Sequence, residues 1–280
     1  MPCKRAGDCL KRSACWAFCA VVHCFVVLCL VLPCLAGGVE QAKSGAPVLR
    51  FRVLASLPHD REAFTQGLVV DGDVFHESVG RYGHSALREV DVRTGRVLRE
   101  VRLSDDVFAE GLARVGDALV QLTWRRGEAY VHDVATFART GRFEYSGQGW
   151  GLAFDGQRLV QSNGSDVLVF RDPATFAACG RVRVHDGGES VRLLNELEWM
   201  DGLVLANVWH DPRVAAIDPD SGAVRYWIDL SDLVREAQRA GGGVANGLAW
   251  DCVQRRLYVT GKNWPHVHVV EIMYDDQDGM

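Results

Sequence analysis

The stretch VFAEGLARVGDALVQLTW (107–124) decides the fold, because its order of apolar run, tight turn and second apolar run recurs along the chain. It places one acid, Glu110, directly before the glycine and leucine of the first run. The other copies begin at Thr65, Gly149, Asn195 and Ala245 and read TQGLVVDGDVFHES, GWGLAFDGQRLVQSNGS, NELEWMDGLVLANVW and ANGLAWDCVQRRLYVTGK. A third apolar run follows each copy, so every unit consists of strands and turns.

One leucine anchors each unit and measures the repeat. The anchors are Leu68, Leu112, Leu152, Leu197 and Leu248, at intervals of 44, 40, 45 and 51 residues. Repeats of this length built only from strands and turns are typical of propellers. The sequence therefore predicts an all-β fold, a single five-bladed β-propeller over residues 46–275. A β-sandwich is the competing architecture, but it does not need a repeated Gly-Leu.

The longest interval holds an insertion, SDLVREAQRAGGG (231–243), which predicts a short helix before the last blade. Ser231 is expected to cap this helix and Gly241 to end it. The fifth unit stops after three strands, near Met273. VLRFRVL (48–54) is expected to supply its fourth strand, so that the N-terminal strand closes the propeller and leaves no open edge there.

The first 38 residues differ in composition from the rest. Four Lys or Arg residues precede an apolar run over 14–35, and Gly37 and Gly38 follow. This order is typical of a secretory signal, so residues 1–38 are expected to direct export to a periplasm or another extracytoplasmic space and then to be removed. The run is also just long enough for an uncleaved membrane anchor. Leu32-Pro33-Cys34 further allows lipid attachment at Cys34.

Cysteine usage and charge narrow the classes of partner. Seven of the nine cysteines lie at or before Cys34, and the other two, Cys179 and Cys252, are too few for a disulfide framework. We expect two separate buried thiols, although one bridge between them is conceivable. No Cys-His cluster suggests zinc. Without its basic leader the chain has a net charge of about −8, which argues against nucleic acid or anionic membrane surfaces as partners.

Propeller geometry explains the position of Glu110. The residue two before each anchor leucine is expected at one mouth of the central channel, and the ends of the second strands reach the same mouth. The first strands contribute Gln66, Glu110, Trp150, Asn195 and Asn246, and the second strands contribute Glu77, Ser78, Trp124, Ser162, Asn163, Trp209 and Lys262. A pit with an acid, a lysine, amides and three tryptophans is the default binding site of such a fold.

Taken singly, these residues have plainer explanations. A tryptophan at a strand end more often packs than binds, an asparagine beside glycine shapes a turn, and Lys262 suits a solvated loop. Their convergence favours a site, because unrelated loops would rarely place three indoles and an acid around one axis.

Nine segments across residues 46–275 carry a resemblance to a known family. They are FTQGL (64–68), YGHSALREVDVRTG (82–95), FAEGL (108–112), QLTW (121–124), GWGL (149–152), LNELE (194–198), ANVW (206–209), NGLAWD (246–251) and VTGKNWP (259–265). In order and spacing the chain resembles the plant and bacterial type of glutaminyl cyclase. That family is a five-bladed propeller that converts N-terminal glutamine into pyroglutamate and releases ammonia, without the catalytic zinc of the animal type.

The resemblance implies roles for the pit residues. In the family, the glutamate that matches Glu110 carries catalysis, and the matching aromatic, amide and lysine positions line the pocket. Two positions depart from the family pattern. Ala109 stands where the family usually has glycine, and Gln148 stands where it usually has glutamate, which puts any role of that acid in doubt.

The residue types suit this chemistry. The substrate's α-amine has a pKa of about 8, so much of it is already neutral near physiological pH. The neutral amine can attack the substrate's own side-chain amide carbon. Expelling ammonia requires a general acid, and a carboxyl group among indoles keeps its proton because its pKa is raised. Glu110 is expected to be that acid, with Lys262, Asn195 or Gln66 stabilising the oxyanion. The expected substrate-binding residues are Phe64, Gln66, Phe108, Trp124, Trp150, Trp209 and Asn246, whose rings would fold glutamine into its cyclic shape.

Two other classes of function stay open. A calcium-dependent lactonase would hold its metal with Glu110, Asn195 and Asn246, although three tryptophans and a lysine suit a dication poorly. A noncatalytic propeller would bind peptides without releasing ammonia. The cyclase is expected to need no cofactor or catalytic metal, while a structural cation in the channel is possible. We expect a monomer that acts on peptides or proteins beginning with glutamine.

Overall fold

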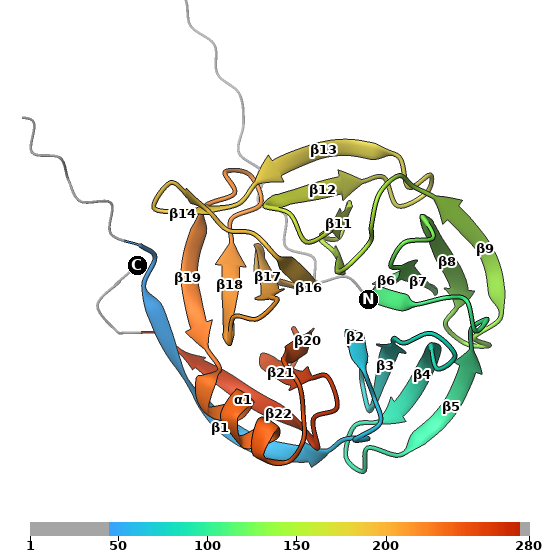
Figure 1. The fold of residues 1–280 in the computed structure, drawn as a ribbon, viewed down its shortest axis with the longest axis horizontal. Helices are drawn as coiled ribbons and strands as arrows, with labels where there is room; N and C mark the ends of the chain where they lie inside the picture. The colour runs from blue at the N-terminus through green and yellow to red at the C-terminus, as the bar shows by residue number, and fades with distance from the viewer. Residues whose placement is uncertain (1–44, 275–280) are drawn as a thin grey trace, which may run out of the picture. The chain divides into compact units, whose positions relative to one another are not determined.

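Each predicted strand–turn–strand unit opens an antiparallel sheet in the computed structural model, which describes residues 45–274. Three sheets have four strands each, in chain order from the centre outward (Figure 1). Their strands are β2 (Thr65–Asp71), β3 (Val74–Val79), β4 (Ala86–Asp91) and β5 (Val97–Arg102); β6 (Ala109–Val115), β7 (Ala118–Thr123), β8 (Glu128–Asp133) and β9 (Arg139–Glu144); and β10 (Leu152–Phe154), β11 (Leu159–Gln161), β12 (Val167–Arg171) and β13 (Ala178–Arg183). The predicted leader, residues 1–38, and Cys34 within it lie outside the described residues.

The other long strands form one eight-stranded sheet made of two halves. One half contains β16 (Leu194–Met200), β17 (Leu203–Val208), β18 (Arg213–Ile217) and β19 (Val224–Asp229), and the other contains β20 (Ala245–Asp251), β21 (Arg256–Gly261), β22 (His266–Met273) and β1 (Val48–Pro58). A small hairpin, β14 (His185–Asp186) and β15 (Glu189–Ser190), precedes them, and α1 (Ser231–Arg239) connects the halves.

The N-terminal strand β1 closes the fold, as predicted. It pairs antiparallel with β22, from Arg50 opposite Met273 to Pro58 opposite His266. Its only pairing with the other half is parallel, at Val48 and Leu49 beside β19. The strand is therefore the fourth strand of the last sheet, and it runs four residues beyond the predicted 48–54.

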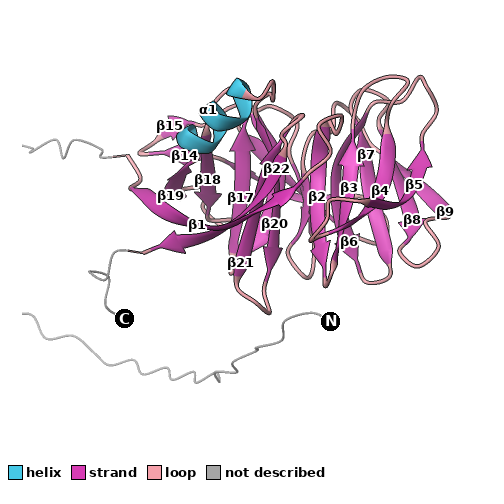
Figure 2. Ribbon diagram, turned by 90° about the horizontal axis from the view of Figure 1, so that it is seen from below, coloured by secondary structure: helices cyan, strands magenta, loops and turns pink. Residues whose placement is uncertain are grey.

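The first strands of the sheets surround a common axis. Around that axis the neighbours are β2 and β6, β6 and β10, β10 and β16, β16 and β20, and finally β20 and β2. Figure 1 looks along this axis, and Figure 2 shows the same strands from the side. Residues that lie far apart in the sequence therefore meet where these strands begin.

Close packing at the axis explains the repeated Gly-Leu. All five anchor leucines are at most 1% exposed. The residue before the anchor is glycine in four units, because the strands leave it no room; a Cβ on Gly151 would lie 1.9 Å from the carbonyl oxygen of Asn195. In the fourth unit this residue is Glu196, and its Oε2 accepts a hydrogen bond of 3.0 Å from the backbone N–H of Leu248. The exception thus joins β16 to β20.

A second repeat marks the outer hairpins. Between the third and fourth strands of each of the first four units, one aspartate Oδ1 accepts hydrogen bonds from both the backbone N–H and the hydroxyl group three residues later. The pairs are Asp91 with Thr94, Asp133 with Thr136, Asp172 with Thr175, and Asp218 with Ser221. The last sheet needs no such turn, because its fourth strand comes from the other end of the chain.

Two local predictions need correction. The helix α1 is present and Gly241 follows it with a φ of 89°, but Ser231 does not cap it. Instead, Asp229 Oδ1 accepts hydrogen bonds from the backbone and hydroxyl of Ser231. Cys179 is a free thiol and exposed rather than buried, because it lies on the outermost strand β13, whereas Cys252 is half-buried.

A buried ion pair fastens the closing strand to the first sheet. His59, directly after β1, places Nε2 2.9 Å from Glu77 Oε1, and both side chains are at most 3% exposed. Thr65 donates a second hydrogen bond to the same oxygen, and His59 Nδ1 lies 2.8 Å from the carbonyl oxygen of Trp264. Burial opposes both charges, but their attraction and hydrogen bonds outweigh it, raising the pKa of His59 and lowering the pKa of Glu77.

Deletion of residues 46–56 should unfold the protein. The deletion removes most of β1 and leaves β22 with an open, unpaired edge, which thermal melting by circular dichroism will detect as loss of the cooperative transition. The control is Arg52→Ala, which keeps the strand and removes only an exposed ion pair with Glu271, worth less than about 1 kcal/mol. A truncated protein that melts at the parental temperature would contradict this role of β1.

The His59–Glu77 pair should stabilise the fold in a defined pH window. The raised pKa of His59 means that its contribution is lost as the pH rises through that pKa, and the lowered pKa of Glu77 means that its contribution is lost in acid. The melting temperature of Glu77→Gln should therefore fall furthest below the parent between about pH 4.3 and pH 6.5, and less at pH 9. A deficit that does not change with pH would show that the pair acts by shape alone.

Candidate active site

β-Bulges aim the pit residues at the axis. The pairing register shifts between Thr65 and Gly67 on β2, and a shift occurs at the corresponding place on β6, β16 and β20. The residues inside these shifts include Gln66, Glu110, Asn195 and Asn246, the predicted positions two before the anchor leucines. A bulge leaves its extra residue outside the ladder and re-aims the side chain. The bulges therefore explain why these polar residues leave the apolar pattern of their strands.

The predicted aromatic residues form a wall in two parts. Lys262 Nζ lies 4.9 Å from the centre of the Phe64 ring, and that ring centre lies 6.2 Å from Phe108. Phe108 in turn lies 5.5 Å from Trp124. On the other side, the ring centres of Trp150 and Trp209 are 5.7 Å apart, edge to face. The structure thus brings Lys262, Phe64, Phe108 and Trp124 together in one group and Trp150 and Trp209 in another.

Gln148 joins the two parts of this wall. Its Oε1 accepts hydrogen bonds from the indole Nε1 groups of Trp124, at 2.8 Å, and Trp150, at 3.0 Å. One amide oxygen therefore holds two indoles in a set orientation. Sequence reasoning treated Gln148 only as a departure from the family pattern and missed this role, because the signal is a contact between side chains of two sheets.

Glu110 and Lys262 are buried ionisable groups that lack a hydrogen-bond or ion-pair partner in the described chain. They are 5% and 9% exposed, and within residues 45–274 neither side-chain head group makes a hydrogen bond or ion pair. Burial raises the pKa of Glu110 well above its usual range, and the nearby Lys262 only partly opposes this. Burial likewise lowers the pKa of Lys262 against the pull of Glu110. Such groups are costly unless a ligand pairs with them, so they mark where a polar substrate binds.

The amide residues have different surroundings. Asn246 Nδ2 donates to Gln66 Oε1 at 2.8 Å and to the backbone oxygen of Thr65, so Asn246 orients Gln66. The side chain of Asn195 makes no hydrogen bond within the described chain, while its backbone carbonyl accepts one from Ser162. Ser78 donates in the same way to the backbone carbonyl of Glu110. The serines of the predicted ring therefore hold the bulges in place.

One residue that was predicted to lie in the pit, Glu77, makes its contacts elsewhere. The sequence prediction also did not include Tyr145, a neighbour of Glu110. Glu77 is paired with His59 and Thr65, which leaves Glu110 as the acid at Lys262. Tyr145 donates a hydrogen bond to the backbone oxygen of Thr123. Burial and, to a smaller extent, the Glu110 carboxylate raise the pKa of Tyr145 to about 12, so its hydroxyl keeps its proton beside the acid.

The residues do not form an obvious metal site. Within residues 45–274, no group of three or more His, Cys, Asp or Glu side chains is arranged to hold a metal ion. The lactonase hypothesis also requires a dication at Glu110, where Lys262 already contributes a positive charge. Two buried oxygens on β16 and β20, Glu196 Oε1 and Asn246 Oδ1, make no hydrogen bond within the described chain. Burial raises the pKa of Glu196, which favours a bound water over a cation at that oxygen.

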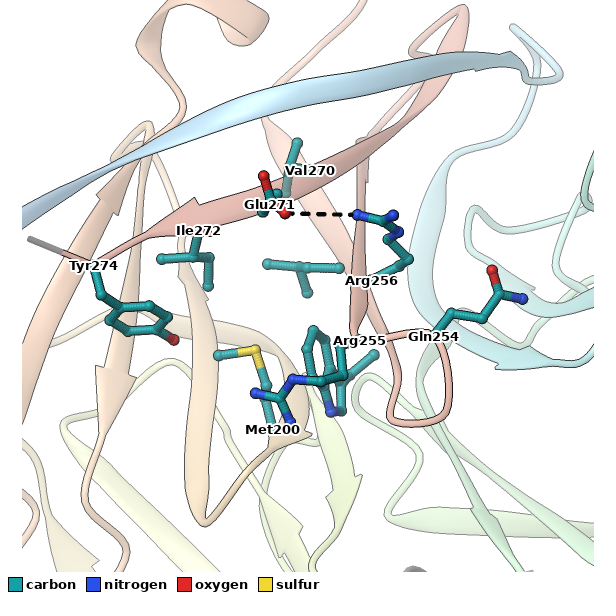
Figure 3. A pocket seen from close by; sticks show the side chains of 10 residues that line it. Met200, Gln254, Arg255, Arg256, Val270, Glu271, Ile272 and Tyr274 are labelled. Atoms are coloured by element: carbon teal, nitrogen blue, oxygen red, sulfur yellow. Dashed lines mark ion pairs between the residues drawn. The ribbon is translucent and has the colours of Figure 1, made fainter. Parts of the chain in front are cut away.

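A separate pocket of about 410 Å³ lies between β16, β20, β21 and β22 (Figure 3). Met200, Ile272 and Tyr274 line it together with Arg255 and Arg256, and Arg256 faces Glu271 across it. None of the predicted site residues contributes to this pocket.

Among residues 45–274, no helix has the length and apolar character needed to span a membrane.

Comparison with known proteins assigns the chain to a family. Residues 26–272 match the family model described as glutamine cyclotransferase, so the chain belongs to that family. It is similar to a glutaminyl-peptide cyclotransferase of Arabidopsis thaliana, with 40% identity over 225 residues that cover 79% of this chain and 70% of the relative. It is also similar to the crystal structure of Myxococcus xanthus glutaminyl cyclase, with 37% identity and a TM-score of 0.77. That match covers 82% of this chain and all of the other.

Replacing Gln148 should disturb both indoles at once. Gln148→Leu removes the shared acceptor, and two hydrogen bonds of about 1 kcal/mol each imply roughly a 10-fold or greater loss of kcat/KM on glutamine-initiated peptides. Gln148→Glu keeps an acceptor of the same shape and is the matched control. Equal kinetics for the Leu and Glu variants would exclude an orienting role for this residue.

Proposed function

We propose that the protein is a glutaminyl-peptide cyclotransferase that converts the N-terminal glutamine of peptides or proteins into pyroglutamate and releases ammonia. The observation that carries this proposal is the buried, unpartnered Glu110 and Lys262 beside an aromatic wall. The family membership and the 40% identical cyclotransferase support it.

The reaction exchanges one amide for another. The α-amine attacks the side-chain amide carbon, forming a tetrahedral intermediate with a negative oxygen. Collapse of this intermediate breaks the bond to the original amide nitrogen, which leaves as ammonia once it has gained a proton. The amine loses one proton as the ring forms, so a single acid–base group balances the reaction.

Glu110 is suited to that task. Its raised pKa keeps it protonated at pH values where an ordinary glutamate is ionised, so it can donate to the leaving nitrogen. It recovers the proton from the attacking amine. Lys262, Asn195 and Gln66 are buried and are proposed to stabilise the oxyanion, because the low dielectric of a buried pit strengthens that attraction.

The aromatic wall supplies orientation. An extended glutamine side chain must fold so that the amine and the amide carbon meet, and holding it there removes much of the entropic barrier. Trp124 and Trp150, fixed by Gln148, and Phe64 and Phe108 provide rigid surfaces for this purpose.

The finer structural assignment is also a proposal. We infer a five-bladed propeller, since the first strands form a closed ring and the eight-stranded sheet divides at the two residue pairs between β1 and β19. We further propose an exported monomer whose residues 1–38 serve as a signal or anchor, supported by the basic and apolar pattern of that segment. Catalysis needs no cofactor, and a cation in the channel, if bound, is structural.

Glu110→Gln should separate catalysis from folding. Turnover of glutamine-initiated peptides, measured as ammonia release, should fall by about 10²-fold or more. The melting temperature should stay at or above the parental value, because a neutral amide avoids the burial of a carboxylate. The control is Glu144→Gln, which changes an exposed glutamate on β9.

Near-parental turnover in the Glu110→Gln protein would remove Glu110 from the acid role. An absence of ammonia release by the parent would reject the proposed function itself. Loss of parental activity in a chelator would favour a metal-dependent hydrolase instead.

The pH profile should reveal the coupling of Glu110 to Lys262. Activity should fall at low pH, where the substrate amine is protonated, and at high pH, where Glu110 loses its proton. Because Lys262 lowers the pKa of Glu110, Lys262→Met should move the alkaline limb to higher pH while reducing the rate. An alkaline limb that moves to lower pH would contradict this coupling.

A further inference from the structure

Arg81 occupies a strained turn at the edge of the candidate site. It lies between β3 and β4 with a φ of 98°, in the region that glycine adopts easily and long side chains rarely do. Such a conformation is unfavourable for a residue other than glycine and persists only where surrounding contacts maintain it. The contacts of Arg81 therefore require an explanation.

The guanidinium of Arg81 is held against the aromatic wall. Its Cζ lies 4.5 Å from the centre of the Phe64 ring, the same ring that Lys262 Nζ approaches to 4.9 Å. One Nη2 hydrogen bond of 3.0 Å reaches Asn263 Oδ1, directly after Lys262 in the chain. The strained turn thus brings a second positive charge beside the residue that faces Glu110.

Most of the guanidinium remains available. Arginine has five N–H donors, and within residues 45–274 only the contact to Asn263 uses one of them. No carboxylate of the described chain forms an ion pair with Arg81, whereas Arg88 and Arg99 on neighbouring strands are both paired with acids. Arg81 is exposed, so an incoming group can reach it.

A second arginine repeats this arrangement at the other end of the same wall. Arg125 Cζ lies 3.8 Å from the centre of the Trp124 ring, and it also lacks an ion-pair partner among residues 45–274. Phe108 lies between Phe64 and Trp124. Two guanidinium groups without ion-pair partners in the described chain are therefore stacked on this edge of the pit, on a chain whose net charge is negative.

We propose that Arg81 binds the carboxylate of an acidic residue that directly follows the N-terminal glutamine of the substrate. The inference rests on the proposed function, because the glutamine itself must occupy the pit at Glu110 and Lys262. The next residue then leaves the pit across its rim, where a guanidinium stacked on an aromatic ring offers a pair of donors to a carboxylate. The preferred substrates are accordingly peptides that begin with Gln-Glu or Gln-Asp.

The test compares two peptide amides, Gln-Glu-Ala-NH₂ and Gln-Gln-Ala-NH₂, which differ only in the charge of the second residue. The parent should show a several-fold higher kcat/KM for the acidic peptide at low salt, mainly through KM, and high salt should reduce the difference. Arg81→Gln should bring the ratio of the two kcat/KM values close to one. The matched control is Arg139→Gln, which removes a guanidinium stacked on Tyr130 along β9 and should leave the ratio unchanged.

A further variant separates recognition from turn structure. Arg81→Gly relieves the positive φ, so it should keep or raise the melting temperature while abolishing the preference for the acidic peptide. An equal loss on both peptides, or a preference that survives in Arg81→Gln, would overturn the proposal. If the parent cyclises both peptides equally well, only this inference fails; if it cyclises neither, the proposed function fails.

Discussion

Pairing of the N-terminal strand β1 with β22 is the constraint on which the other features depend. The ring of first strands, closed where β20 lies beside β2, brings Gln66, Glu110, Asn195 and Asn246 to one end of the axis, and β1 completes the last sheet of that ring. Lys262 belongs to the last sheet and Glu110 to the second, so their electrostatic coupling exists only in the closed ring. The buried pair of His59 and Glu77 reinforces the closure where β1 meets the first sheet. The site therefore requires the closed fold.

Groups that are costly to bury and a strained turn are found together at the mouth of this ring. Leucines at the axis and clusters between sheets provide apolar burial, which offsets the cost of two buried ionisable groups that lack hydrogen-bond and ion-pair partners in the described chain. Glu110 gains a raised pKa from that burial, and this property suits it to hold a proton for a leaving amine. Arg81 adds a strained backbone to the same region. These unfavourable features therefore occur where substrate is expected to bind, and the contacts of the surrounding sheets maintain them.

Much of the fold could be read from the sequence because its determinants are local and periodic. The strand–turn–strand repeat, the helix before the last sheet and the closing strand were predicted correctly. The Asp-x-x-Thr/Ser turns, which the prediction did not use, are also visible in the sequence and report the same hairpins. The errors were local: Ser231 is not a cap, and Cys179 is exposed on an outer strand.

The sequence by itself determined which residue types would surround the axis, because hydrophobic period and turn chemistry are written in consecutive residues. Only the tertiary structure decided what each of those residues does. Both Glu77 and Glu110 were predicted to lie at the mouth of the channel. Glu77 forms an ion pair with His59, whereas Glu110 has no ion-pair partner in the described chain and lies near Lys262. Gln148 became the link between two indoles, and Arg81 the cation above Phe64, through contacts between separate turns and sheets. Such contacts depend on distances between sheets of the closed ring, and no spacing along the chain encodes those distances.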